Sequence, residues 1–485
     1  MAKVLIVGAG VSGLSAGIYS CLFGHEVTIC ERHKRAGGNL TGWQRGEFHI
    51  DNCIHWLTGT NPMTDNYKTW CELGALGNVE IYQGESLYTC ERNGKRLSLY
   101  RSLDRLEKEM LALSPCDKKE ILSLTEAVRL VSRLSSTGGV YKNEGISVPR
   151  LVLKSPKLLK YCLLSTGELS KRFSHPLIRD LIVSVLGECF SAMALIVVFS
   201  TFTSDNGGIP HGSSVGMAER MKKRFLDLGG ELKLSCEAEC VNSDGTRAVS
   251  VDFKDGRRIF ADYIILATDP RISYEKLLNS PLPVSIAKAF RDTGAPSFSS
   301  FHTAFAVDAE GLPFSGDFAF EIPKREQRFL HTKYLILREF SHEPDFSPKG
   351  KSLMQTLTFC DSELSQRFIR LYDNREKYDG LKARIAECIE RLVRDKFPEL
   401  SGKLSSIDVW TPATYKRYTG APGGEYMSCV LAPRRLPCRI KSESGVYPNV
   451  FIATQWQRAP GGLPIAAEVG KMAAEAVEKF NSGKR

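Results

Sequence analysis

The feature that most constrains the fold is a glycine-rich turn between a buried strand and a helix at the start of the chain. Residues 4–7 form a continuous apolar run, as in a strand buried on both faces of a parallel sheet. Gly8-Ala9-Gly10-Val11-Ser12-Gly13 follows, then a helical pattern to Leu22 and a second apolar run over residues 27–30 that ends at Glu31. This strand–helix–strand unit has the GxGxxG spacing typical of a dinucleotide-binding site.

Each residue type in this unit has a physical role. Gly8 permits the tight turn, Gly10 lets a pyrophosphate approach the backbone, and Gly13 lets the helix pack closely on the strand. The free N–H groups at the start of the helix favour phosphates. Glu31 is placed to accept hydrogen bonds from a ribose diol. We therefore expect a bound dinucleotide, and a glycine turn that binds nothing is the alternative.

Two observations favour FAD over a nicotinamide cofactor. A second glycine pair, Gly37-Gly38, follows shortly after the acid and would let the backbone pass close to a long, extended cofactor. Only one GxGxxG occurs, so a second site for NAD(P)H is not expected. The residues predicted to hold FAD at this end of the chain are Gly8, Ala9, Gly10, Val11, Ser12, Gly13, Glu31, Arg32, Gly37, Gly38 and Asn39.

A further glycine motif lies near the C-terminus. Residues 450–453 have the pattern of a buried strand, and Pro460-Gly461-Gly462-Leu463-Pro464 precedes a helical pattern that extends to Phe480. Pro464 suits the first turn of a helix, where a missing N–H costs nothing. The N-terminus of such a helix would stabilise negative charge on a reduced flavin. The alternative is a surface amphipathic helix after a glycine loop.

Three separated motifs make the sequence resemble the flavin-containing phytoene desaturase, carotenoid isomerase and retinol saturase superfamily. They are the first glycine unit, the stretch from Gly207-Gly208-Ile209-Pro210 to Asp269-Pro270, and the C-terminal glycine motif, so the resemblance covers essentially the full length. It implies that the backbone at Val241 contacts the adenine. The cofactor-binding residues assigned in the second and third motifs are Val241, Ala267, Thr268, Gln455, Gly461, Gly462, Leu463, Pro464 and Ala467.

The third motif departs from the family pattern. Relatives usually carry an acid there, against the ribityl chain or a phosphate, whereas this chain has Thr454-Gln455. Gln455 can still donate and accept hydrogen bonds, so FAD binding is compatible with it. The resemblance also implies that residues 48–56 pass the flavin, which makes His55 a candidate proton donor to a double bond. The alternative is a histidine packed in the domain core.

The motifs predict an α/β fold. We expect a discontinuous Rossmann-like FAD-binding domain, a three-layer ββα sandwich, with an inserted α+β substrate domain. Residues 1–105, 206–290 and 421–485 are assigned to the FAD-binding domain. Residues 106–205, mainly helical, and 291–420, a sheet plus helix, are assigned to the substrate domain.

The resemblance implies an FAD-dependent oxidoreductase that transfers hydride between flavin N5 and an apolar unsaturated substrate of polyene, isoprenoid or lipid-like type, as a desaturase or saturase. Flavin chemistry needs few acid–base groups, and we expect no metal site. Three alternatives stay open: a non-redox cis–trans isomerase that uses reduced flavin, an amine oxidase, and a flavin-free carrier or escort protein on the same fold. The electron acceptor or donor and the oligomeric state are also open.

Composition narrows the partners and the location. Lys+Arg 65 against Asp+Glu 55 gives a net charge of +10, a modest and dispersed excess, so no nucleic-acid partner is expected. Fourteen cysteines without a Cys-x-x-Cys spacing are typical of reduced thiols in a cytoplasmic protein. The longest apolar run, residues 192–202, is too short to span a bilayer, and we expect no signal peptide or transmembrane helix. An apolar substrate would suit a peripheral membrane contact.

Overall fold

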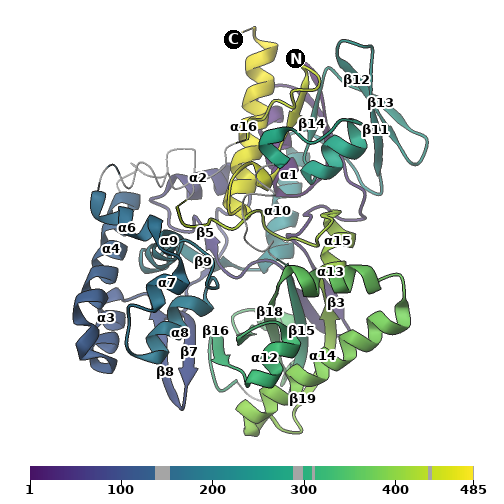
Figure 1. Cartoon of the computed structure of the whole chain (residues 1–485). Coiled ribbons are helices and arrows are strands. Elements are labelled where there is room, and N and C mark those ends of the chain that lie inside the picture. The colour runs from purple at the N-terminus through teal and green to yellow at the C-terminus, as the bar shows by residue number, and fades with distance from the viewer. Residues whose placement is uncertain (137–152, 154, 288–298, 309–311, 435–439, 484–485) are drawn as a thin grey trace.

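A five-stranded parallel sheet organises one half of the molecule. The computed structural model of the chain describes residues 1–136, 153, 155–287, 299–308, 312–434 and 440–483 (Figure 1). The strand order of this first sheet is β10-β2-β1-β14-β20, and every neighbouring pair is parallel. Its strands are β1 (Lys3–Val7), β2 (Glu26–Cys30), β10 (Glu231–Lys233), β14 (Tyr263–Leu266) and β20 (Val450–Ile452). Distant parts of the sequence therefore lie side by side in it.

Successive side chains of each strand point to opposite faces of the first sheet. Both faces are buried, because a different layer covers each of them. The helices on one face are α1 (Val11–Leu22), α10 (Ser213–Asp227) and α16 (Leu463–Asn481). The antiparallel strands on the other face are β11 (Ala238–Ser243), β12 (Ala248–Phe253) and β13 (Arg258–Phe260). Val4 and Ile6 pack against the helices, whereas Leu5 and Val7 pack against these strands. This is the predicted ββα sandwich.

A seven-stranded mixed sheet organises the other half, in the order β19-β15-β18-β17-β16-β7-β8. Its strands are β7 (Ser86–Arg92), β8 (Lys95–Tyr100), β15 (Ser299–Val307), β16 (Asp317–Glu321), β17 (Tyr334–Glu339), β18 (Ser352–Cys360) and β19 (Leu404–Trp410). Helices α13 (Ser362–Leu371) and α14 (Arg375–Lys396) cover one face, where Leu335 and Leu337 are buried. Ile336 points to the opposite face, toward a group of helices.

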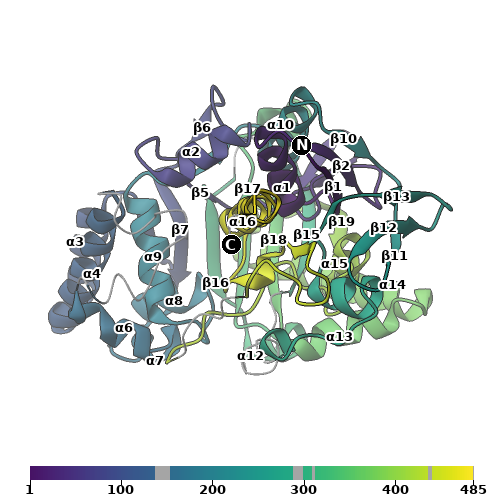
Figure 2. The ribbon, with the colours of Figure 1, turned by 90° about the horizontal axis from the view of Figure 1, so that it is seen from above.

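This group of helices, which we call the helical lobe, lies to one side of both sheets (Figures 1 and 2). Its members are α3 (Leu103–Leu113), α4 (Lys118–Ser136), α6 (Leu159–Leu163), α7 (Thr166–Ser170), α8 (Pro176–Ser184) and α9 (Ala192–Thr203). None of the helices in the part of the chain that the structure describes combines the length and apolar character needed to cross a membrane.

Short elements connect these layers. They are β3 (Gly42–Arg45), β4 (Phe48–Asp51), β5 (Leu57–Thr58), β6 (Ile81–Tyr82), β9 (Gly207–Pro210), α2 (Asp65–Glu72), α12 (Lys324–Leu330) and α15 (Pro412–Thr419). Strand β16 pairs in parallel with β7, so residues 86–100 belong to the second sheet. We expected these residues in the first part of the FAD-binding domain. Their pairing with β16 could not be foreseen, because local sequence patterns do not show which distant strands pair. The exact domain boundaries stay a prediction.

Candidate active site

A cavity of about 1030 Å³ lies where the two sheets and the helical lobe meet. Its wall includes the glycine turns of the first sheet and part of helix α9. All but four of the residues predicted to bind FAD line it. The lining members of that set are Gly8, Gly10, Val11, Ser12, Glu31, Arg32, Gly37, Gly38, Asn39, Ala267, Thr268, Gln455, Gly461, Gly462, Leu463 and Pro464.

Three of the remaining four predicted residues stand directly behind this wall. The Ala9 N–H donates to Glu31 Oε2 at 2.8 Å. A Cβ atom on Gly13 would lie 1.8 Å from the Gly8 carbonyl oxygen, so the start of α1 rests directly on the glycine turn. The Ala467 carbonyl accepts a hydrogen bond from Ser15 Oγ at 2.6 Å, which joins α16 to α1. These residues support the wall rather than form it.

Val241 is the fourth, and the structure does not bring it to the cavity. The chain before β11 lies beside Glu31, since the Cys236 N–H donates to the Glu31 carbonyl at 2.8 Å. Glu237 and Ala238 line the cavity there, whereas the later residues of β11 are not part of its lining. Val241 packs instead with the side chains between the parallel sheet and β11–β13. Ala238 is thus the residue of β11 that lines the cavity, and the adenine contact expected at Val241 stays a prediction.

The residues around the first glycine turn fit a dinucleotide. A Cβ atom on Gly10 would meet nothing closer than Gly38 Cα at 4.0 Å, so the backbone is bare on that side. Helix α1 begins after Gly10 with no side-chain cap, which leaves its positive N-terminus available to phosphates. Asn39 Oδ1 is buried without a hydrogen-bond partner among the described residues. Such an acceptor fits a polar ligand in this part of the cavity.

The amide of Gln455 has a defined role in the third motif. Its Oε1 accepts from the Gly462 N–H at 2.9 Å, and its Nε2 donates to the Tyr426 carbonyl at 3.1 Å. A carboxylate could make the first contact but not the second, because it has no N–H to donate. Helix α16 begins after Gly462, which has a φ of +90° and no side-chain cap, with Pro464 in its first turn. The positive end of α16 therefore lies in the cavity wall.

Another part of the wall is apolar, and we call it the apolar chamber. Helix α9 contributes Ala194, Val197, Val198 and Thr201, a spacing that places all four on one helical face. The other members of the chamber are Tyr88, Val185, Leu186, Phe190, Ile336, Leu357 and Phe359. Tyr88 is not a free polar group, because its hydroxyl donates to the Ser184 carbonyl at 3.1 Å. The chamber therefore suits a ligand without charge.

His55 also lines the cavity, together with its neighbour Trp56. The His55 Nδ1 atom lies 3.6 Å from the buried Asp317 Oδ2. Burial and the Arg338 guanidinium lower the pKa of His55, and Asp317 partly opposes this shift. Burial alone would raise the pKa of Asp317, but Arg338 and His55 together bring it down to about 2. The carboxylate thus stays ionised beside the imidazole.

Two of these polar residues had no sequence signal. Asp317 and Arg338 face each other across the paired strands β16 and β17, and no motif surrounds either residue. The same is true of Arg271, which pairs with Asp269 at 2.6 Å and with Glu425 at 3.2 Å at the cavity wall. These charged side chains meet their partners only through the pairing of strands and the packing of loops in the folded chain, which the sequence patterns did not indicate.

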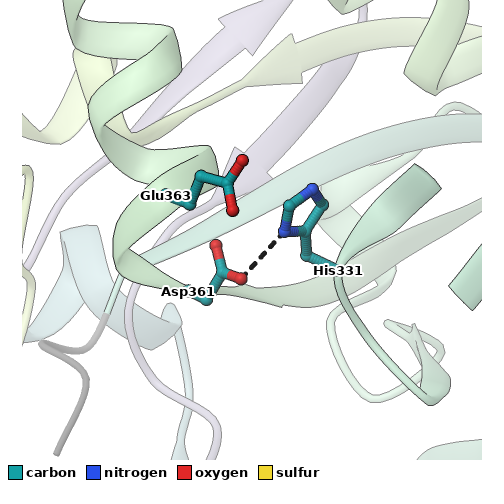
Figure 3. A group of neighbouring side chains, drawn as sticks. All are labelled: His331, Asp361 and Glu363. Carbon is teal, nitrogen blue, oxygen red and sulfur yellow. Dashed lines mark hydrogen bonds and ion pairs between the residues drawn. The ribbon is translucent and has the colours of Figure 1, made fainter. Parts of the chain in front are cut away.

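A second group of polar side chains lies away from this cavity. His331, Asp361 and Glu363 offer ligand atoms that all lie within 4.8 Å of one another (Figure 3). Asp361 is already used: its Oδ1 accepts from the Leu364 N–H at 2.8 Å as the cap of α13, and its Oδ2 contacts His331 Nδ1 at 2.8 Å. These contacts give the group a structural role, and we assign no metal to it.

Comparison with known proteins agrees with this site. Prolycopene isomerase from Daucus carota is 23% identical over 445 residues, which cover 87% of this chain and 71% of that protein. The 4,4'-diaponeurosporene oxygenase of Staphylococcus haemolyticus is 19% identical over 501 residues, which cover 98% of this chain and 97% of that protein. These relatives confirm the resemblance to the carotenoid isomerase and phytoene desaturase superfamily.

Solved structures share the fold. An oxidoreductase from Methanosarcina mazei aligns with a TM-score of 0.60 at 16% identity, covering 98% of this chain and 99% of that one. An engineered putrescine oxidase aligns with a TM-score of 0.58 at 15% identity and 98% coverage of both chains. The family model described as flavin containing amine oxidoreductase matches residues 11–478. The chain therefore belongs to the flavin containing amine oxidoreductase family, and it is an FAD-dependent oxidoreductase.

Proposed function

We propose that this enzyme transfers hydride between the flavin and a carbon atom of an apolar, unsaturated substrate of polyene type, as a desaturase or a saturase. One observation supports this most: a single cavity is lined both by the glycine motifs and by the apolar chamber. The names of the relatives, which include prolycopene isomerase and diaponeurosporene oxygenase, support a carotenoid-like substrate.

The chain's own residues would contribute binding, orientation and exclusion of water. The uncapped start of α1 and Glu31 would hold the phosphates and a ribose of FAD, and the start of α16 would lie near negative charge on the ring system. FAD supplies the hydride chemistry when it is bound. The apolar chamber would bind a hydrocarbon chain without hydrogen bonds, since each buried CH₂ group contributes about 0.8 kcal/mol.

The charges in the cavity wall make an amine substrate less suitable. One common way to bind a buried ammonium group is to pair it with a free carboxylate. Asp317 is paired with Arg338, and both Asp269 and Glu425 are paired with Arg271.

The other two alternatives concern the role of the flavin. The match to a flavin-containing family argues against a flavin-free carrier. A cis–trans isomerase acting with reduced flavin is the second candidate, and the prolycopene isomerase relatives favour it.

The test is anaerobic mixing of the FAD-loaded enzyme with candidate polyenes. A saturase oxidises its reduced flavin when a polyene is added, and a desaturase bleaches its oxidised flavin with a more saturated polyene. An isomerase converts the polyene only when its flavin is reduced, and the flavin spectrum does not change. Putrescine and other amines serve as comparison substrates. Bleaching by amines, together with no response of any kind to polyenes, would show that the proposal is wrong.

A further inference from the structure

Arg338 makes an unusually complete set of contacts in the interior. Its Nε and Nη2 atoms donate to the two carboxylate oxygens of Asp317, each at 2.7 Å. Its Nη1 donates to the Ile54 carbonyl at 2.8 Å, and Nη2 also lies 3.2 Å from the His55 carbonyl. The side chain is buried, as is that of Asp317. The Arg338 guanidinium therefore connects the Asp317 carboxylate to the main chain of residues 54–55.

The location of this ion pair suggests a purpose other than stability. Taking two charges out of water has a large desolvation cost, and well-packed apolar residues are often at least as stable in such a place. Here the pair stands beside apolar chamber residues, with Ile336 close to both Arg338 and His55 around a small enclosed pocket. Arg338 contacts the main-chain carbonyls of Ile54 and His55. A second contact holds the same segment, because the Ile54 N–H donates to Ser214 Oγ at 2.9 Å.

The orientation of the imidazole follows from the same contacts. Nδ1 of His55 faces the Asp317 carboxylate at 3.6 Å, which leaves Nε2 as the ring nitrogen available to a ligand. The charged and titratable groups that face this ring from neighbouring strands are Asp317 on β16, Arg338 on β17 and His302 on β15. Only the carboxylate among them favours a protonated imidazole.

We propose that Asp317 and Arg338 are positioning residues that hold His55 for proton transfer to or from the substrate. This inference rests on the proposed function. Saturation of a carbon–carbon double bond needs a hydride, which the reduced cofactor supplies, and a proton at the other carbon. The Nε2–H bond of the His55 imidazolium breaks as that C–H bond forms, and solvent reprotonates the neutral ring. In desaturation the neutral imidazole would take the proton from one carbon, and the oxidised cofactor, when bound, would supply the acceptor for the hydride from the other.

The first test measures the pKa of His55 without any substrate. Histidine ring signals are followed by NMR as a function of pH, and H55Q assigns the signal. Asp317→Asn removes the carboxylate that contacts the ring at Nδ1, so the pKa of His55 should fall by about 1–2 units. Asp180→Asn is the matched control, because Asp180 is also buried and pairs with an arginine, Arg92, away from the cavity. It should leave the His55 signal unchanged.

The second test measures turnover in a variant that keeps the interior filled. D317L/R338M replaces both charges by apolar side chains of similar size, so the fold should persist. We expect normal FAD content and reduction by dithionite, a kcat lower by about 10–100-fold with little change in KM, and loss of the His55 inflection from the pH profile. The single variant Asp317→Glu keeps a carboxylate beside His55 and should retain a larger part of the wild-type kcat than D317L/R338M does.

The outcomes separate the two proposals. An unchanged His55 pKa in D317N, an equal shift in D180N, or wild-type kcat and pH profile in D317L/R338M would overturn the positioning role. Failure of the wild-type enzyme to act on any polyene would instead overturn the proposed function, and the NMR titration would still report on the coupling between Asp317 and His55.

Discussion

At the scale of single residues, Gly10 and Gly13 have different tasks in the same turn. A Cβ atom on Gly13 would collide with the Gly8 carbonyl oxygen at 1.8 Å, whereas one on Gly10 would meet nothing closer than 4.0 Å. Gly13→Ala should therefore destabilise the FAD-free protein by about 1–3 kcal/mol. Gly10→Ala should leave its stability unchanged and weaken FAD binding, because the methyl group enters the cavity. Thermal unfolding and flavin-fluorescence titration measure the two effects, and equal destabilisation by both would contradict this.

Asp317 should also make stability depend on pH. Arg338 and His55 outweigh the effect of burial and lower its folded-state pKa to about 2 from an ordinary value of 3.8. Because the folded pKa is the lower one, this stabilisation is complete above about pH 4 to 5 and is lost as the pH falls toward 2. Between pH 6 and pH 3 the wild type should lose about 1 kcal/mol that D317L/R338M does not lose. Urea unfolding at the two pH values measures this, and an equal loss in both proteins would refute it.

At the scale of elements, helix α9 forms one side of the apolar chamber with the face that carries Ala194 and Val197. Ala194→Phe should fill part of the chamber, lower activity on long polyenes at least tenfold, and leave FAD binding intact. Val197→Ala enlarges the same face and is the matched control, which should retain activity. Turnover measured with polyenes of different lengths checks this. Loss of FAD from the Ala194→Phe protein would show that the chamber and the cofactor site are not separate.

The same scale shows what sequence patterns can predict. The elements β1, α1, β2 and α16 were all expected, because each combines a continuous apolar or helical period with a glycine turn directly before or after it. The pairing of β7 with β16 and the packing of Val241 in a core cluster rather than in the cavity lining were not expected. Both depend on the register between distant segments, which local periodicity does not contain.

The candidate site divides in the same way. The spacing of the glycines and Glu31 is typical of a dinucleotide motif, so the sequence could group them, and the structure places Gly8, Gly10 and Glu31 in one cavity wall. Asp317 and Arg338 meet only because β16 and β17 pair in one register, which places them directly opposite each other. A one-residue slip would send one of the two side chains to the other face of the sheet. The sequences of the two strands, DFAFE and YLILRE, do not indicate which charged residues will pair.

At the scale of the whole molecule, the cavity wall joins segments that are far apart in the chain. It includes Glu31, Val197, Ala238, Leu357 and Gly462, which come from both sheets and from the helical lobe. A ligand that fills this cavity touches several layers at once and is bound only by the folded chain. Cofactor binding should therefore stabilise the molecule as a unit rather than one domain alone.

The length of the cofactor should decide how large this stabilisation is. FAD at 100 times its dissociation constant adds about 2.7 kcal/mol, which for a chain of this size is a rise in Tm of about 2–3 °C. FMN lacks the adenosine half, so it cannot reach both Glu31 and the start of α16 and should raise Tm less at the same concentration. Differential scanning fluorimetry of the FAD-free protein with FAD, FMN and ADP separates these contributions. Equal shifts with FAD and FMN would mean that the Glu31 end of the cavity does not bind the adenosine half, and Gly10→Ala should abolish the difference between the two flavins.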